Sequence, residues 1–447
     1  MHVHDATIAA LTDQIVAYAV ERVRATDLPL DGPATAEALE AAAGQTITAP
    51  GIGGEAALAL FRDVLAPATI SSDHPGFLSF VPAAPTEASV LFDLIVGASS
   101  IYGGSWMEGA GAVFAENQAL RWIADLVGLP ADAGGVFVSG GTAGNLSALI
   151  AARHAWRARN RRLARVRGII VSSTGSHSSI ASAARAMDAD LVTVPADERG
   201  RMSADSLAVV LERLDPDDRE RIFAIVTTNA GVIDDLDGVG AIAAERDIWL
   251  HVDGAYGGAA LCSPAVRPRF AGIEQCDSFI VDPHKWLFAP FDCCALVYRH
   301  PEIAREAHTQ HAEYLDVLTG EWNPSDYAHH LTRRVRGLPF WFSLATHGTD
   351  AYARAIDTTL AVAGEVADMV RTMDHVELVV EPELSVVLFR RHGWQPADYH
   401  AWSDRLLAAG TGLVVPTSWA GETVLRFCFV NPLTTPALVS EILESMR

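Results

Sequence analysis

Residues 248–258 are IWLHVDGAYGG, and residues 277–286 are DSFIVDPHKW. Each segment is a short apolar run bounded by turn residues, which is typical of a strand buried on both faces in a parallel sheet. Groups just beyond the carboxyl ends of such strands face the ligand crevice of an open α/β sheet. We therefore expect Asp253 and Lys285, which follow the two apolar runs, to lie in one crevice.

A carboxylate and a lysine in one crevice suggest pyridoxal phosphate (PLP) as a cofactor. Its aldehyde needs a lysine to form a Schiff base, and its ring nitrogen stays protonated only beside an anion. We expect burial to lower the pKa of Lys285, which favours the free amine that reacts with an aldehyde. The alternative is a buried Asp–Lys ion pair with a structural role alone, but this leaves His251, His284 and the flanking glycines unexplained.

A second motif has the features of an anion site. Val136–Ser139 is predicted to be a strand that leads through Gly140, Gly141 and Thr142 into a helix. Bare backbone N–H groups and the dipole at a helix N-terminus attract phosphate, and glycine permits close approach. Tight βα turns use glycine for other reasons as well, so the motif indicates a cofactor-phosphate site only together with Lys285. It fits neither a dinucleotide fingerprint nor a P-loop.

The segment HVDGAYGG followed by DPHKW resembles the signature of the group II pyridoxal-phosphate amino-acid decarboxylases, the family of aromatic-amino-acid, glutamate and histidine decarboxylases. The resemblance runs from His74 to Phe342, with a fainter echo from Leu425 to Pro432. It implies an α/β fold, the PLP-dependent transferase fold type I, with a mostly parallel central sheet and a smaller α/β C-terminal domain. It also implies a homodimer with shared active sites.

The resemblance assigns roles to single residues. Lys285 would carry the cofactor and Asp253 would hold its ring nitrogen protonated. His177, in SHSS at 176–179, would stack on the ring and face the substrate carboxylate; a capping serine beside a bystander histidine is the alternative. The other implied cofactor contacts are Gly141, Thr142, Thr228, Ala255 and His284.

In the family, a mobile loop carries a tyrosine that protonates the carbon from which carbon dioxide leaves. Residues 314–330 are predicted to form a loop because they contain several breakers. Tyr327 would be the proton donor, with His329 and His330 as competitors. The spacing from Tyr327 to Arg333 is shorter than the family's usual pattern.

The substrate pocket implied by the resemblance includes Phe80, Val81, Tyr102 and Gly104, with core packing as the alternative for the aromatic residues. These residues are uncharged, which favours an aromatic or otherwise uncharged amino acid over glutamate. Gly104 lies where aromatic-specific relatives have a bulkier residue, so the pocket is expected to be wider or differently filled.

Composition limits the function classes. The chain has 447 residues, of which 50% are hydrophobic, and a formal net charge of −22. Nucleic acids and anionic membranes need basic patches, so neither is expected as a partner. The start of the chain lacks the features of a signal peptide, and the five cysteines show no paired metal spacing. A cytoplasmic protein without a metal site is expected.

The length favours more than one domain. We expect an N-terminal helical arm at 1–60, a large PLP-binding domain at 61–345 and a small domain at 346–447. The expected activity is the decarboxylation of an L-amino acid to an amine and carbon dioxide. The rivals are an aminotransferase, an aldehyde-forming decarboxylase, another lyase of the same fold, and a catalytically silent structural paralogue.

Overall fold

The computed structural model describes residues 2, 4–228, 231–310 and 321–447. It forms two compact units. The first comprises Met1–Pro82, Glu365–Val379 and Val387–Arg447, and the second comprises Ala83–Gly364 and Val380–Val386. The three-part domain division expected from the sequence stays a prediction.

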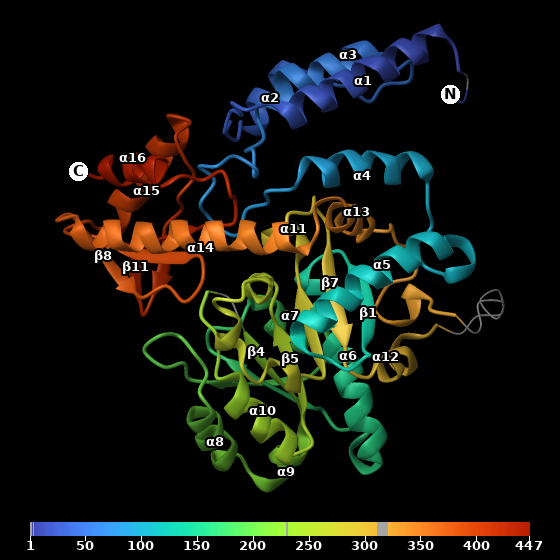
Figure 1. The fold of residues 1–447 in the computed structure, drawn as a ribbon, viewed down its shortest axis with the longest axis vertical. Helices are drawn as coiled ribbons and strands as arrows, with labels where there is room; N and C mark the ends of the chain where they lie inside the picture. Colours follow the sequence, from blue (N-terminus) through green and yellow to red (C-terminus); the bar gives the residue numbers. More distant parts are fainter. Residues whose placement is uncertain (1, 3, 229–230, 311–320) are drawn as a thin grey trace. The chain divides into compact units, whose positions relative to one another are not determined.

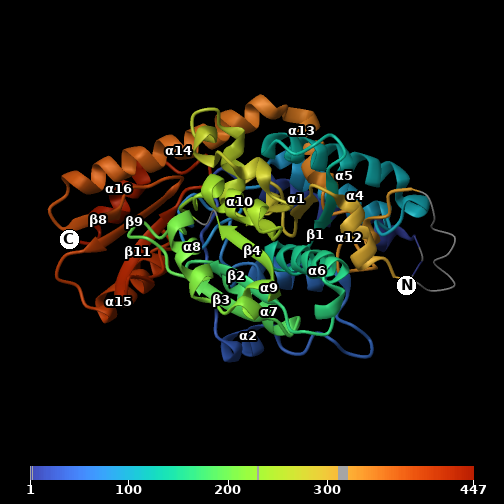
Figure 2. The same ribbon diagram turned by 90° about the horizontal axis from the view of Figure 1, so that it is seen from below.

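The second unit is built on a seven-stranded sheet, which Figure 1 shows and which Figure 2 shows from below. Its strand order is β1-β7-β6-β5-β4-β2-β3. Strands β2 to β6 pair in parallel, whereas β7 runs antiparallel to β1 and β6. The mostly parallel sheet expected from the sequence is confirmed. The strands are β1 (Gly134–Val138), β2 (Ile169–Ser173), β3 (Asp190–Val194), β4 (Ile222–Thr228), β5 (Trp249–Asp253), β6 (Ser278–Val281) and β7 (Cys294–Tyr298).

The central strands are buried along their whole length because helices cover the sheet. Every residue of β4, β5, β6 and β7 is buried, which explains their nearly continuous apolar sequences. Helix α6 packs across β1 and β4 to β7, and α5 packs on β1 and β7. The helices of this unit are α4 (Glu87–Ser99), α5 (Trp106–Val127), α6 (Gly141–Arg159), α7 (Ser178–Ala186), α8 (Ala204–Arg213), α9 (Pro216–Arg221), α10 (Leu236–Glu245), α11 (Pro283–Trp286), α12 (Pro301–His308) and α13 (Leu338–His347).

The first unit contains a four-stranded sheet of order β10-β11-β9-β8 and the N-terminal helices. Asp5 caps α1 by accepting from two backbone N–H groups. Helix α14 (Thr349–Thr372) runs through the division between the units. The remaining elements are α1 (Ala6–Arg24), α2 (Ala36–Ala43), α3 (Gly54–Leu60), β8 (Val376–Val380), β9 (Val386–Arg391), α15 (Pro396–Ala408), β10 (Thr417–Trp419), β11 (Glu422–Cys428) and α16 (Pro436–Glu444).

Within the described ranges, every helix is too short or too polar to cross a membrane.

A glycine allows β1 and β7 to pair. Gly135 lies opposite Val297, and a Cβ at this position would overlap the backbone carbonyl of Leu296. Because β1 is the strand that leads into α6, this close approach sets the position of the helix start.

A buried ion pair ties α5 to the chain that follows residue 320. Arg333 donates to both oxygens of the Glu116 carboxylate, at 2.6 and 2.8 Å, and both side chains are almost fully buried. Glu116 also accepts from the backbone N–H of Gly337, and Arg333 donates to the carbonyl of Gly103. Removing one partner would leave the other charge buried without compensation.

We expect Glu116→Gln to destabilise the protein by about 3–5 kcal/mol, because Arg333 would then be a buried, unpaired cation. Denaturant unfolding of wild type and variant measures the loss. The matched control is Arg162→Ala, which breaks the exposed Arg162–Glu220 pair and should cost at most about 1 kcal/mol. Equal, small losses in both variants would contradict the importance of the buried pair.

Candidate active site

Lys285 pairs with a carboxylate that the sequence analysis did not single out. Its Nζ lies 2.8 Å from Oδ2 of Asp282, whose side chain is 2% exposed, whereas that of Lys285 is 25% exposed. Asp282 directly follows β6 and precedes the short helix α11, so the two side chains are three residues apart on one turn. Lys285 is also the only lysine in the sequence.

The expected low pKa of Lys285 is wrong. Burial acts to lower it, but the charge of Asp282 and its hydrogen bond outweigh burial, and Asp253 adds to them, so the pKa of Lys285 is raised above its ordinary value. The ammonium form is therefore favoured in the free protein. The partner that reverses the effect of burial lies only three residues before the lysine.

The start of α6 offers free backbone donors. Its N-terminus has no side-chain cap, and the N–H groups of Gly141 and Thr142 have no partner among the described residues. A Cβ at Gly141 would lie 3.3 Å from both Ala255 Cβ and Asp282 Oδ2. The helix start thus lies beside the ends of β5 and β6, as the anion-site prediction requires.

Asp253 ends β5 and is held by two donors. Its Oδ2 accepts from Asn145 Nδ2 at 2.8 Å, and its Oδ1 accepts from the backbone N–H of Ala255 at 3.1 Å. Asn145 also contacts His251 and Ser179. Asp253 is buried and its charge acts on Lys285, so the structure brings the two predicted residues into one site.

His177 is the N-cap of α7, and its ring is exposed. Its Nδ1 accepts from the backbone N–H of Ser179 at 3.2 Å and lies 2.8 Å from Ser179 Oγ. The alternative reading, a capping serine with a bystander histidine, is corrected: the histidine itself caps the helix. One ring nitrogen is turned inward and the rest of the ring remains accessible.

Thr228 and His284 lie at neighbouring strand ends. Thr228 is the last residue of β4 and is in register with Asp253, and its buried hydroxyl has no partner among the described residues. His284 Nδ1 is 2.7 Å from the carbonyl of Cys293, and its Nε2 is 3.7 Å from Asp282. Burial lowers the pKa of His284, which favours its neutral form.

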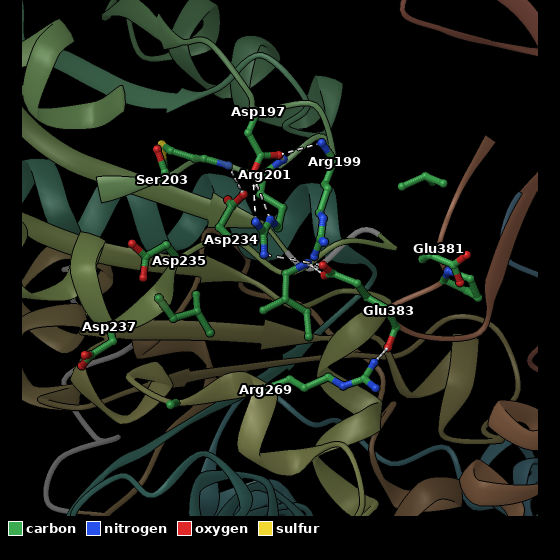
Figure 3. A pocket seen from close by; sticks show the side chains of 16 residues that line it. Asp197, Arg199, Arg201, Ser203, Asp234, Asp235, Asp237, Arg269, Glu381 and Glu383 are labelled. Carbon is green, nitrogen blue, oxygen red and sulfur yellow. Dashed lines mark hydrogen bonds and ion pairs between the residues drawn. The ribbon is translucent and has the colours of Figure 1, made fainter. Parts of the chain in front are cut away.

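A separate cavity of about 710 Å³ lies in the second unit (Figure 3). Its charged residues largely pair with one another, as Arg201 does with Asp197. Asp234 in its wall accepts from the backbone N–H groups of Met202 and Thr228, and burial raises the pKa of Asp234 to about 7. Neither Lys285 nor Asp253 lines this cavity, so its acidic wall supports the end of β4 from outside the candidate site.

The predicted proton donor is a buried core residue. Tyr327 is 4% exposed, stacks on Trp322 with ring centroids 4.0 Å apart, and accepts through its carbonyl from the hydroxyl of Tyr298. Burial raises its pKa to about 12. Residues 314–320 of the predicted loop lie outside the described residues, and 324–326 form a 3₁₀ turn instead of an open loop.

The competitors of Tyr327 differ in exposure. His329 is exposed, and its backbone N–H donates to Ser147. His330 Nε2 is 3.0 Å from the carbonyl of Pro324, and burial lowers its pKa to about 4.

The predicted pocket residues fall into two groups. Tyr102 and Gly104 belong to the second unit, where the Tyr102 hydroxyl donates to the carbonyl of Leu331 and the Gly104 carbonyl accepts from Ser325 N–H. Phe80 and Val81 belong to the first unit, and Phe80 is 60% exposed. A pocket made of all four stays a prediction.

The polar groups of the second unit fit PLP. Lys285 is an amine for the aldehyde, Asp253 is an anion for the ring nitrogen, and the start of α6 has unpaired N–H groups for the phosphate. The buried hydroxyl of Thr228 and Asp282 Oδ1 both lack partners within the described chain. Such orphaned atoms at one sheet edge are typical of a site that takes a polar ligand.

Sequence reasoning missed Asn145, Ser179 and Asp282. Asn145 is four residues after Gly141, so both lie on one face of α6, and Asp282 is three residues before Lys285 in the same way. This helical spacing was the available signal.

The sequence is similar to that of known proteins. Residues 53–392 match the model of the pyridoxal-dependent decarboxylase conserved domain. The chain is 28% identical over 393 residues to the aromatic-L-amino-acid decarboxylase of Bacillus atrophaeus, covering 84% of this chain and 81% of that protein. It is 31% identical over 390 residues to the L-2,4-diaminobutyrate decarboxylase of Rhizobium meliloti (strain 1021), covering 83% and 77%.

The fold has solved counterparts. The structure of Oryza sativa TDC with PLP and tryptamine matches with a TM-score of 0.91 at 23% identity, covering 100% of this chain and 99% of that one. The fold type expected from the sequence is therefore confirmed. Because the family model matches most of the chain, the chain belongs to the PLP-dependent amino-acid decarboxylases. These are carboxy-lyases that use pyridoxal 5'-phosphate as their cofactor.

Proposed function

We propose that this enzyme decarboxylates an L-amino acid with an uncharged, preferably aromatic, side chain. The proposal is supported by the uncharged character of the residues that are predicted to contact the substrate, Phe80, Val81, Tyr102 and Gly104, none of which could pair with a side-chain carboxylate or ammonium. Burying a charged substrate side chain among them would cost several kcal/mol. A diaminobutyrate substrate is the second candidate, because the Rhizobium meliloti relative acts on that amino acid.

We assign the cofactor contacts as follows. Lys285 carries the aldehyde, Asp253 holds the proton of the ring nitrogen, and the N–H groups of Gly141 and Thr142 bind the phosphate at the start of α6. When bound, PLP accepts the electron pair left on the substrate carbon as carbon dioxide leaves. The supporting geometry is the convergence of these groups, with Thr228, Ala255 and His284, at one edge of the sheet.

The protein's own groups control protons and orientation. Asp282 holds a proton on Lys285, and that proton must leave before the amine can attack an aldehyde. His177 is proposed to stack its exposed ring on the cofactor and to face the substrate carboxylate with its outward nitrogen. Fixed groups of this kind orient a substrate before reaction.

The identity of the proton donor is a separate proposal. A general acid must reach the reacting atom, and Tyr327 is buried against Trp322. These contacts support a packing role for Tyr327 and leave the exposed His329 as the competitor with access to solvent.

We also propose a homodimer in the cytoplasm. Helices α4 and α5 expose large apolar side chains, including Leu94, Ile95, Met107 and Phe114, which a second subunit would remove from water. The five cysteines are free and buried, as expected of a protein in a reducing compartment.

Carbon dioxide release from a panel of amino acids tests the function. We expect release from aromatic amino acids, weaker or no release from glutamate and 2,4-diaminobutyrate, and none with Lys285→Ala. The assay also measures amine and aldehyde products, since an aldehyde with hydrogen peroxide would indicate the oxidative reaction. Preferential release from 2,4-diaminobutyrate would contradict the substrate proposal while leaving the family assignment intact.

We expect Asp282→Asn to lower the pKa of Lys285, because burial would then act without the opposing charge. The rate at which the apoenzyme reacts with pyridoxal rises with pH as the free amine forms. In Asp282→Asn, the midpoint of this pH dependence should move to lower pH. The matched control is Asp292→Asn, an exposed carboxylate that pairs with Arg336. A midpoint that stays in place in Asp282→Asn would show that Asp282 does not set the pKa of Lys285.

Tyr327→Phe separates packing from proton donation. Phenylalanine keeps the stacking on Trp322. We therefore expect the rate of carbon dioxide release to fall by much less than the roughly 10²–10⁴-fold that a general acid contributes. Tyr327→Ala should destabilise the protein by about 3–5 kcal/mol, as for other large core aromatics. A hundredfold slower Tyr327→Phe enzyme with unchanged stability would instead support Tyr327 as the donor.

A further inference from the structure

Asn145 connects three residues of the candidate site through one buried amide. Its Nδ2 lies 2.8 Å from Asp253 Oδ2 and 2.8 Å from Ser179 Oγ, and its Oδ1 lies 2.8 Å from His251 Nε2. All four side chains are buried. The amide therefore uses both of its N–H donors and its carbonyl within the protein.

The donor and the acceptor of each hydrogen bond around the amide can be assigned. A carboxylate oxygen without a proton can only accept, so the amide nitrogen faces Asp253 and the amide oxygen accepts from His251. Burial lowers the pKa of His251 to about 4, so the ring is neutral with its proton on Nε2. Its Nδ1 then accepts from Ser278 Oγ at 2.8 Å, and Ser278 in turn accepts from Trp249 Nε1 at 2.8 Å.

A branch of the same network reaches His177. Ser179 Oγ accepts from Asn145 and is left to donate its own proton to His177 Nδ1 at 2.8 Å. The backbone N–H of Ser179, which can only donate, also points at Nδ1. His177 Nδ1 is thus an acceptor, and the proton of the neutral ring must be on Nε2, the nitrogen turned away from the helix.

We propose that Asn145 is a positioning residue of the cofactor site, which fixes the orientation of the Asp253 carboxylate and, through Ser179, supports the Nε2–H form of His177. The inference deepens the proposed function, because it rests on Asp253 as the partner of the ring nitrogen. Asn145 itself touches neither cofactor nor substrate in this proposal. It acts by holding Asp253, which would touch the cofactor. In metal sites, the groups that hydrogen-bond to a metal-binding histidine orient that histidine in the same way.

Cofactor binding to the apoenzyme tests this with two ligands. One is PLP, and the other is its carbocyclic analogue, in which C–H replaces the ring nitrogen. In Asn145→Ala, the Asp253 carboxylate loses one hydrogen bond. The variant should therefore bind PLP roughly ten- to hundredfold more weakly than wild type. Binding of the analogue should be unchanged, because it has no ring nitrogen for Asp253 to hold.

The control is Ser147→Ala, two residues further along α6, whose hydroxyl contacts Ala143 and His329 but not the network. This variant should bind both ligands as wild type does. If Asn145→Ala is insoluble, Asn145→Ser retains a small polar side chain that cannot span to both Asp253 and His251, and the same selective loss is expected. Parallel thermal unfolding of each variant checks that the fold is intact.

Three results would overturn the inference. Equal weakening of both ligands by Asn145→Ala would indicate a general structural role, and unchanged PLP binding would indicate no role. Wild-type apoenzyme that binds PLP and the analogue equally would overturn the assignment of Asp253 to the ring nitrogen, and with it the cofactor site on which the inference rests.

Discussion

The parallel pairing of β5 with β6 is the constraint on which the site depends. Their register places His251 opposite Ser278 and Asp253 opposite Ile280, so both strands end at the same edge of the sheet. Asp282 and then Lys285 follow β6 at that edge. The hydrogen bond between His251 and Ser278 crosses this strand pair, and a slip by one residue would turn Ser278 to the opposite face. The strand register and the polar network thus support each other.

Burial acts in the same direction on three ionisable groups at this edge, but their net pKa shifts differ in sign. It lowers the pKa of His251 and His284, which both remain neutral, and it also acts to lower that of Lys285. Only Lys285 has a carboxylate at hydrogen-bond distance from its charged atom, and Asp282 reverses the effect for it. The ammonium form of Lys285 is therefore favoured in the free protein, and its loss of a proton would be part of the proposed chemistry.

The strands and the positions of Asp253, Lys285 and Gly141 could be predicted from the sequence, because each follows a local pattern: an apolar run with turn residues, or a strand with a glycine turn. Asn145 and Asp282 were indicated only by their helical spacing from Gly141 and Lys285. That spacing does not show that Asn145 bonds to residues of other elements, or that Asp282 reverses the effect of burial on the pKa of Lys285. Tyr327 was expected on an open loop, since the breakers around it are typical of one. Its stacking on Trp322 depends on packing that no short-range pattern reports.

Lys285 is the only lysine in the sequence, so a cofactor bound to a lysine side chain can be bound only there. Borohydride reduction of the holoenzyme fixes the cofactor covalently to that amine, and intact-mass and peptide mass spectrometry then locate it. The account predicts one added cofactor per chain, on the peptide that contains Lys285. A cofactor on the N-terminal amine, or no added mass at all, would contradict it.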